Sequence, residues 1–283
     1  MYMFLVFDAG STKTDVRLVA ENGETHSLEL AGINPFFMDK EAIGAELRRA
    51  REAFPSSAVG SVYYYGAGCV SDYESLFEQL LTALFPQARV EVHSDLYAAC
   101  RATLGDGAGI ACILGTGSNS CYYDGARVVR NVPPLGYVLG DEGSGATMGR
   151  CLVGDVLKGC APAEVCDLFW TWCESDYKTV MGGVYKGEFP NRFLATFSRF
   201  LAENIAMPYC RGLVEKSFVA FFERNVLQYP ASVKEIGFVG SIAAHFSDIL
   251  REVAERYGYR VLTIVGRPMD ALVAYHRERL FPA

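Results

Sequence analysis

Two stretches of the sequence place glycine and hydroxyl side chains directly after an apolar run, a composition suited to holding phosphate groups. The first stretch contains Gly10, Ser11, Thr12 and Lys13. Glycine lets the backbone approach an anion closely, and turn amides and hydroxyls donate hydrogen bonds to phosphate oxygens. Asp8 precedes this turn, and its carboxylate can hold Mg2+ through water. An ordinary hairpin turn explains the same residues about equally well.

A second turn of this kind and a third, different one occur later in the chain. The second contains Gly115, Thr116 and Gly117, again after an apolar run. Gly240 and Ser241 lie between a predicted strand and a predicted helix, where free amides and the helix dipole favour an anion or a polar ligand edge. The plainer interpretation of that junction is a tight turn with Ser241 as the helix N-cap. The three turns together favour nucleotide binding, although neither a GxxxxGK(S/T) loop nor a GxGxxG turn after the first strand is present.

The elements that must position these turns alternate between short β-rich runs and amphipathic helices, which predicts an α/β fold with parallel pairing in each sheet. In the first half we predict a hairpin over 3–20, helices over 41–54, 76–84 and 96–104, and strands over 62–65 and 89–93. In the second half we predict strands flanking the turn in 109–125, helices over 143–158, 191–205, 209–228 and 241–258, strands over 235–240 and 260–265, and a final helix. The second half thus repeats the opening pattern of apolar strand, glycine-rich turn and polar strand.

The length of the chain favours two lobes over one. Of its 283 residues, 51% are hydrophobic, which is enough for one large core or two modest ones. The glycine-rich segment 105–109 is the predicted boundary, giving an N-terminal lobe over 1–106 and a C-terminal lobe over 107–267. We expect the last helix, over 268–283, to pack back on the N-terminal lobe.

Composition narrows the class of partner and the compartment. Lys and Arg number 26 against 33 Asp and Glu, a net charge of -7, which disfavours a nucleic-acid partner. No run approaches the roughly 20 apolar residues of a membrane span, and no secretory signal is visible. The nine cysteines show no metal-ligand spacing, so we expect reduced thiols and a cytoplasmic protein. The negative net charge favours a small molecule as the partner.

The motifs, taken in order, resemble a known superfamily. DAGSTKTD, LGTGSNS and FVGSIA are similar to the phosphate-1, phosphate-2 and adenosine segments of actin-like ATPases and sugar kinases. GDEGSG, over residues 140–145, resembles the N-acetylglucosamine kinase branch of the BadF/BadG/BcrA/BcrD ATPase family. The resemblance implies two ribonuclease H-like lobes around a nucleotide cleft, with ATP, Mg2+ and a sugar, most simply a hexosamine, meeting between them.

By that resemblance Asp95 is the general base that accepts the proton of the sugar hydroxyl, and Asp141 binds sugar hydroxyls. Taken alone, Asp95 or its neighbour Ser94 is an ordinary helix cap, and Asp141 an acid at a helix start. The resemblance also assigns substrate contacts to Asn34, Gly66 and Gly136. The segment before GDEGSG departs from the family pattern, since Pro133 to Tyr137 replace a glycine-rich, Trp-containing stretch.

Two other functions stay open at this point. An ATPase that activates a 2-hydroxyacyl-CoA dehydratase shares the nucleotide motifs and holds an iron–sulfur cluster through cysteines. Cys151, Cys160, Cys166 and Cys173 are available, but their spacings match no cluster motif. A non-catalytic ATP-binding sensor on the same fold is the other option, because fold does not fix function. The sequence leaves open whether the chain forms a homodimer.

Overall fold

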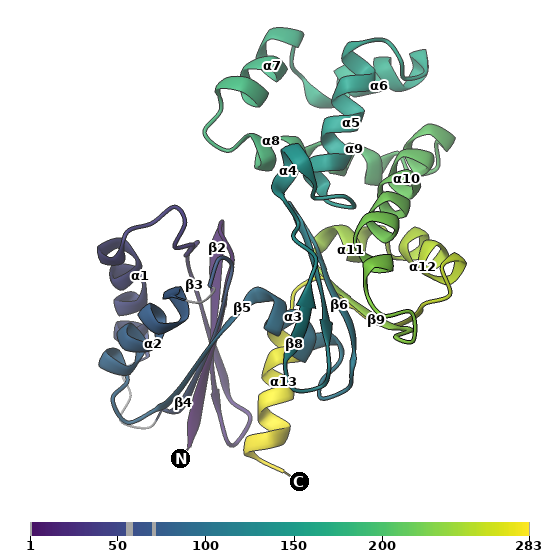
Figure 1. Cartoon of the computed structure of the whole chain (residues 1–283). Coiled ribbons are helices and arrows are strands. Elements are labelled where there is room, and N and C mark those ends of the chain that lie inside the picture. Colours follow the sequence, from purple (N-terminus) through teal and green to yellow (C-terminus); the bar gives the residue numbers. More distant parts are fainter. Residues whose placement is uncertain (1, 55–58, 70–71, 283) are drawn as a thin grey trace. The chain divides into compact units, whose positions relative to one another are not determined.

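Two five-stranded mixed sheets, each covered by helices, make up the chain (Figure 1). The computed structural model describes residues 2–54, 59–69 and 72–282. One unit comprises residues 1–105 and 267–283, and the other comprises residues 106–266. The predicted α/β fold class is confirmed, and so is the prediction of parallel strand pairs in each sheet.

The sheet of the first unit is built around a buried central strand. Its strands are β1 (Met3–Ala9), β2 (Lys13–Ala20), β3 (Thr25–Ala31), β4 (Val59–Gly66) and β5 (Arg89–Ser94), in the order β3-β2-β1-β4-β5. The β1 strand pairs antiparallel with β2 and parallel with β4. Successive side chains of a strand point to opposite faces, so Phe7 and Phe4 of β1 lie in two different hydrophobic clusters.

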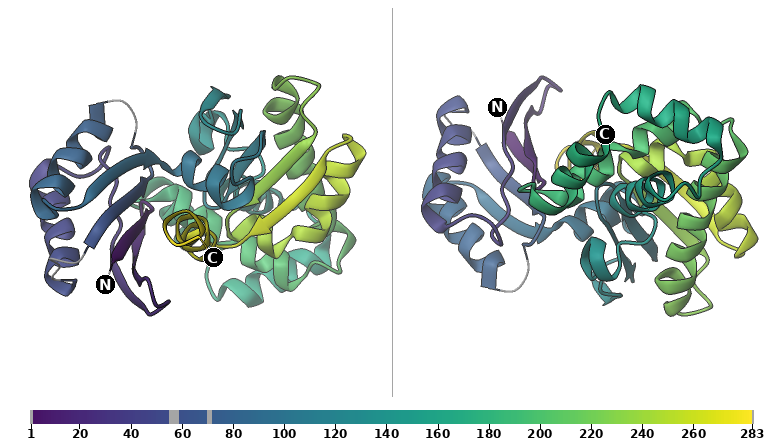
Figure 2. Two further views of the ribbon diagram at one scale, coloured as in Figure 1. Left: turned by 90° about the horizontal axis from the view of Figure 1, so that it is seen from below. Right: turned by 90° about the horizontal axis from the view of Figure 1, so that it is seen from above.

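Helices cover both faces of this sheet (Figure 1 and Figure 2). They are α1 (Lys40–Ala53), α2 (Asp72–Leu84), α3 (Asp95–Thr103) and α13 (Met269–Leu280). Phe77 of α2 stacks on Tyr64 of β4 on one face, with ring centroids 4.4 Å apart. On the other face Ala98 of α3 and Leu272 of α13 share a cluster with Phe4. The last helix therefore belongs to the first unit.

The sheet of the second unit has the same connectivity as the first. Its strands are β6 (Gly109–Leu114), β7 (Ser118–Tyr123), β8 (Val128–Asn131), β9 (Glu235–Val239) and β10 (Arg260–Val265). From β8 the order is β8-β7-β6-β9-β10, which repeats β3-β2-β1-β4-β5 strand for strand. The repeat seen in the sequence pattern is thus a repeat of topology.

Most of the helices belong to the second unit. They are α4 (Gly136–Leu139), α5 (Gly145–Leu157), α6 (Ala163–Cys173), α7 (Tyr177–Lys186), α8 (Pro190–Thr196), α9 (Ser198–Glu203), α10 (Pro208–Arg224), the 3-10 turn η1 (Val226–Gln228), α11 (Ser241–His245) and α12 (Ser247–Arg256). Their main core joins Cys112 of β6, Leu152 of α5, Phe218 of α10 and Leu250 of α12. The aromatic side chains of Phe193, Phe197 and Phe200 pack in or against this core.

Several predicted element boundaries were wrong for local reasons. The helix predicted from Gly143 begins two residues later, because Gly143 has a φ of 77° and Ser144 is the N-cap. The helix predicted over 191–205 breaks at Phe197, whose N–H bonds to the carbonyl three residues back, at Leu194. The helix over 241–258 breaks at Phe246, and the helix over 209–228 ends at Arg224 before η1. Strands β3 and β8 were not predicted; both lie at sheet edges and are largely exposed.

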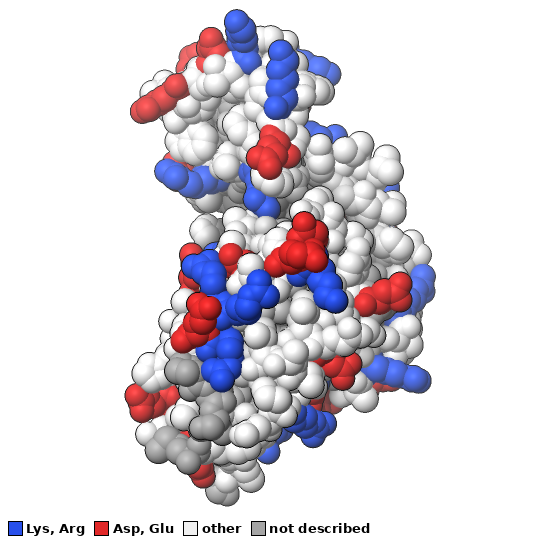
Figure 3. Space-filling view, turned by 90° about the vertical axis from the view of Figure 1, so that its left-hand side faces the viewer, with Lys and Arg blue, Asp and Glu red and all other residues white. Residues whose placement is uncertain are grey.

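The surface of the protein carries charges of both signs. On the face drawn in Figure 3, positive and negative side chains lie interspersed. All nine cysteines lie in the described part of the chain, and none of them forms a disulfide. Among the described residues, no helix is long and apolar enough to cross a membrane, and no group of three or more His, Cys, Asp or Glu is placed to hold a metal ion.

Candidate active site

The first predicted phosphate turn links β1 and β2 and is fixed by backbone hydrogen bonds. The Gly10 N–H donates to the Lys13 carbonyl over 3.0 Å, which closes the turn. The segment after β3 then clamps it, since Gly32 N–H donates to the Thr12 carbonyl and Ile33 N–H to the Gly10 carbonyl. A Cβ on Gly32 would stand 2.3 Å from the Ser11 carbonyl oxygen, so only glycine fits there. Sequence reasoning missed Gly32.

Strand register brings the predicted residues of this unit to one edge of the sheet. Ala9 of β1 is paired with Gly66 of β4, and Gly66 is paired with Ser94 of β5. These three strands are parallel, so their carboxyl ends meet at the same edge, with about 4.8 Å between neighbouring strands. Asp8 precedes Ala9 and Asp95 follows Ser94, so both carboxylates flank this row.

Both carboxyl groups hold their protons more tightly than usual. Burial, followed by the charges of Asp15 and Asp95, raises the pKa of Asp8 to about 7, against the opposing effect of Lys13. Burial also raises the pKa of Asp95 to about 6, against the backbone N–H groups of Leu96 and of Asp95 itself. A base works best when its pKa lies near the working pH, which suits Asp95 to proton transfer. Ser94 occupies the N-cap position of α3 but makes no side-chain capping bond.

The charge around Asp8 also fits a cation. The carboxylates of Asp15 and Asp95 both disfavour ionisation of Asp8, and a divalent ion would relieve that repulsion. Mg2+ keeps several waters and is commonly held by one or two carboxylates together with substrate phosphates. Asp8 therefore suits the water-mediated role that the sequence suggests.

Asn34 and Lys13 are both engaged with neighbouring residues. Asn34 is 7% exposed; its Nδ2 donates to Ser11 Oγ over 2.7 Å, and its Oδ1 accepts from the Phe36 N–H. One N–H and one lone pair of the Asn34 amide remain for a ligand. Lys13 Nζ lies 2.7 Å from Glu29 Oε2 on β3, and this bond lowers the pKa of Glu29.

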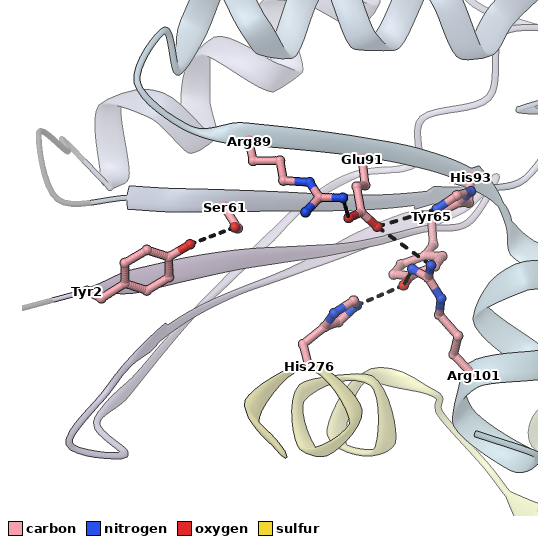
Figure 4. Close-up of polar contacts among 8 residues, drawn as sticks. All are labelled: Tyr2, Ser61, Tyr65, Arg89, Glu91, His93, Arg101 and His276. Carbon is pink, nitrogen blue, oxygen red and sulfur yellow. Dashed lines mark hydrogen bonds and ion pairs between the residues drawn. The ribbon is translucent and has the colours of Figure 1, made fainter. Parts of the chain in front are cut away.

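A polar network joins strands β4 and β5 to helices α3 and α13 (Figure 4). Arg101 of α3 donates to the Tyr65 hydroxyl and lies 3.6 Å from the Glu91 carboxylate. The Tyr65 hydroxyl is also 2.8 Å from His276 Nε2 of α13. Burial and the charge of Arg101 lower the pKa of His276 to about 3, so the imidazole is neutral and can accept a hydrogen bond from the Tyr65 hydroxyl. Tyr65 immediately precedes Gly66, and Arg101 shares its helix with Asp95, so the network fixes both.

The second phosphate turn, in the other unit, packs backbone to backbone against two further segments. Gly115 N–H donates to the Gly117 carbonyl, and Gly145 N–H at the start of α5 donates to the Gly115 carbonyl over 2.8 Å. Gly240 has a φ of 122°, and a Cβ there would stand 2.2 Å from the Leu114 carbonyl oxygen. Gly240 itself is the N-cap of α11, so the N-cap interpretation of Ser241 was wrong; Ser241 is the first helical residue.

Asp141 of GDEGSG faces the second turn. Its Oδ1 accepts from the Ser118 N–H over 3.2 Å, and its backbone carbonyl accepts from Thr147 Oγ1 over 2.8 Å. The side chain is 9% exposed, and burial raises the pKa to about 6, with the Ser118 N–H opposing and Glu142 adding to the shift. Its φ of 53° is left-handed, so Asp141 is an outlier held in place by these bonds. Gly136, at the start of α4, has open space at its Cβ position.

A cavity of about 240 Å3 lies against the second turn within this unit. It brings together three predicted residues and several that sequence reasoning missed. Its lining residues are Gly115, Thr116, Arg192, Ala195, Thr196, Ser198, Ser241 and Ile242. Arg192 supplies a positive charge beside the hydroxyls of Thr116 and Ser241. Arg192 and Thr196 lie one turn apart on α8, and the packing of that helix brings them to the cavity.

Comparison with known proteins identifies relatives through structure. No protein-family model and no curated protein matches the chain. A crystal structure of a putative N-acetylglucosamine kinase from Porphyromonas gingivalis is 40% identical, covers 98% of this chain and 99% of its own, and has a TM-score of 0.91.

Two more distant structures share the fold. A putative N-acetylglucosamine kinase from Chromobacterium violaceum is 18% identical with a TM-score of 0.69, covering 97% of this chain and 99% of its own. MamK bound to AMPPNP is 13% identical with a TM-score of 0.56, covering 100% of this chain and 99% of its own. The predicted actin-like ATPase fold is confirmed, and the narrower resemblance to the BadF/BadG/BcrA/BcrD branch stays a prediction. The chain belongs to the same protein family as the putative N-acetylglucosamine kinase of Porphyromonas gingivalis.

Proposed function

We propose that the protein is an ATP-dependent kinase that phosphorylates a hydroxyl group of an amino sugar. The observation that carries this proposal is the row Ala9, Gly66 and Ser94, which sets Asp8 and Asp95 at one sheet edge beside a closed glycine turn. Membership in the family of a protein named as an N-acetylglucosamine kinase gives independent support.

The nucleotide is assigned to the two glycine turns and the cavity beside the second. Thr12 and Thr116 hydroxyls, with the amides of Gly10 and Gly117, would donate to phosphate oxygens. Arg192 would add positive charge from the cavity wall. Gly240 and Ser241 would contact the adenosine part of the nucleotide. Lys13 is assigned a smaller part, because its ammonium group is already paired with Glu29.

Asp95 is assigned the role of general base. The acceptor hydroxyl attacks the γ-phosphorus in line, the bond from that phosphorus to the ADP oxygen breaks, and the hydroxyl proton passes to the Asp95 carboxylate. Mg2+, held through water by Asp8, would supply charge neutralisation on the phosphates. A carboxyl with a pKa of about 6 is ionised at neutral pH and still accepts a proton readily.

The acceptor is proposed to be N-acetylglucosamine or a related hexosamine. Asn34 keeps one amide hydrogen and one lone pair for a sugar hydroxyl, and Asp141 offers a second carboxylate oxygen. Gly66 and Gly136 would line the acceptor side without side chains. The kinase is proposed to act in the cytoplasm.

An ADP-release assay across acceptors tests this function. Glucosamine, N-acetylglucosamine, N-acetylmannosamine, glucose and an anhydro amino sugar would each be added to enzyme and MgATP. We expect ADP release to rise at least about tenfold with one amino sugar, matched by an equal amount of sugar phosphate. If ATP binds and no sugar stimulates its turnover, the kinase proposal fails, and one of the two alternatives, the dehydratase-activating ATPase or the ATP-binding sensor, replaces it.

A further inference from the structure

One large cavity of the described residues lies apart from the proposed nucleotide site. It has a volume of about 670 Å3, lies wholly within the second unit, and is walled by α4, α5 and α10. None of its lining residues lines the cavity at Gly115 and Ser241. Its volume falls in the range of about 300–1,000 Å3 that is usual for small-molecule sites.

The cavity exists because one face of α10 carries small side chains. Gly212, Ser217 and Ala220 lie on that face at helical spacing, between longer residues. A Cβ placed on Gly212 would find no atom within 4 Å. The space in front of Gly212 is therefore open, and a larger side chain would enter it without displacing a neighbour.

The charges around the cavity are unbalanced in favour of an anion. Both carboxylates are already engaged: Glu142 lies 2.6 Å from Arg224 Nε, and Asp155 accepts from the Tyr209 hydroxyl over 2.7 Å. Arg150 of α5 and Lys216 of α10, by contrast, form no ion pair with any described carboxylate. With Arg224, the lining carries three positive side chains against two carboxylates, a net charge of +1 in a protein of net charge -7.

The mouth of the same cavity is apolar. Val138 and Leu139 of α4 are 70% and 69% exposed, and Leu213 of α10 lies in the opposite wall. Burial of such side chains contributes about 25 cal/mol for each Å2 removed from water. A ligand that covers these apolar side chains and also pairs with Arg150 and Lys216 needs an apolar body and a negatively charged group.

We infer that this cavity binds a small organic anion with an apolar body, at a site separate from that of the nucleotide. The site adjoins the GDEGSG segment, because Gly140, Glu142 and Thr147 line it and Thr147 Oγ1 holds the Asp141 carbonyl. An occupant would therefore stiffen the segment that carries Asp141. The inference rests on the cavity and its charges, and it stands whether or not the chain phosphorylates a sugar.

Fluorescence titration with 8-anilinonaphthalene-1-sulfonate, an aromatic sulfonate of this chemical class, tests the inference. The titration is done on the full chain with saturating MgATP, so that the nucleotide site is occupied. Gly212→Leu fills the cavity, and Gly154→Leu is its control, since Gly154 lies on α5 outside the cavity and also has open space at its Cβ. Arg150→Gln with Lys216→Gln removes the free cations, and Lys178→Gln with Lys186→Gln on exposed α7 is the charge-matched control.

We expect saturable binding to the unaltered protein, weakened at least about tenfold by Gly212→Leu and about threefold or more by Arg150→Gln with Lys216→Gln. The two controls bind as the unaltered chain does, and Gly212→Leu melts at the same temperature or higher, because glycine disfavours helix. Displacement of the probe by MgATP, or undiminished binding to Gly212→Leu, would overturn the inference. So would a dimer, seen in sedimentation velocity, that Gly212→Leu dissociates, because a second copy would then cover the cavity.

Discussion

Asn34 Nδ2 donates a hydrogen bond to Ser11 Oγ over 2.7 Å, and this bond joins a proposed acceptor contact to the first phosphate turn. Gly68 packs against the same amide, since a Cβ there would stand 2.8 Å from Asn34 Oδ1. Asn34 is therefore part of the frame of the turn as well as a candidate ligand for the sugar.

Asn34→Ala should damage both stability and catalysis. Loss of the buried amide leaves Ser11 Oγ and the Phe36 N–H without this partner, at a cost of about 1–3 kcal/mol in the free energy of unfolding. We expect a lower Tm in thermal melts and a kcat/KM for the acceptor that falls at least about tenfold. Asn22→Ala, at an exposed turn, is the control; equal effects of the two changes would refute the role given to Asn34.

Gly32→Ala should distort the phosphate turn from outside it. The new methyl group would stand 2.3 Å from the Ser11 carbonyl oxygen, so the backbone of the turn must shift. We expect the KM for ATP to rise at least about tenfold in steady-state kinetics. Gly154→Ala has open space at its Cβ and should leave the KM unchanged. Normal kinetics of Gly32→Ala would show that the clamp does not shape the nucleotide site.

Asp8→Asn should stabilise the protein at high pH. The folded-state pKa of Asp8, about 7, lies above the unfolded value near 4, so the folded chain binds more protons between these values. This carboxyl thus contributes least to stability above pH 7, and its penalty vanishes as pH falls below 4. We expect Asp8→Asn to raise Tm at pH 8 and to leave it nearly unchanged at pH 4. A lower Tm at pH 8 would contradict the burial of this charge.

Arg101→Met should lower kcat while leaving the KM for ATP nearly unchanged. Without Arg101 the Tyr65 hydroxyl and Glu91 lose a common partner, and the strand ends that carry Gly66 and Asp95 loosen. A misplacement of about 1 Å can cost a hundredfold in rate.

Arg89→Met is the matched control for that change, because Arg89 pairs with the same Glu91 at 3.2 Å but is 78% exposed. Exposed pairs contribute about 0–1 kcal/mol, so its kinetics should be normal. Equal losses in the two variants would point to the charge of Glu91 rather than to the network. Faster hydrogen–deuterium exchange over 91–96 in Arg101→Met alone would show the loosening without an activity assay.

Local chemistry explains which parts of the site were predictable. The turns at Gly10 and Gly115 combine residues that form turns in any context, and Asp95 follows a recognisable strand, so sequence alone located them. Arg192 and Ser198 reach their cavity only through the packing of α8 and α9, which no local pattern specifies. Gly32 is needed because of a carbonyl 21 positions earlier in the chain. Strands β3 and β8 were not predicted, because largely exposed edge strands lack the alternation of buried and exposed residues that identifies a strand in the sequence.

Phosphoryl transfer by Asp95→Asn tests the central claim most directly. Asparagine keeps the shape of the side chain and removes its ability to accept a proton. Its neutral amide resembles a protonated carboxyl, the form that this site already favours by raising the pKa of Asp95. Sugar phosphate formed from MgATP and the best acceptor would be measured together with the Kd for ATP. We predict a loss in kcat of at least about a hundredfold with a Kd within threefold of normal. Turnover that stays within threefold of normal would contradict the account.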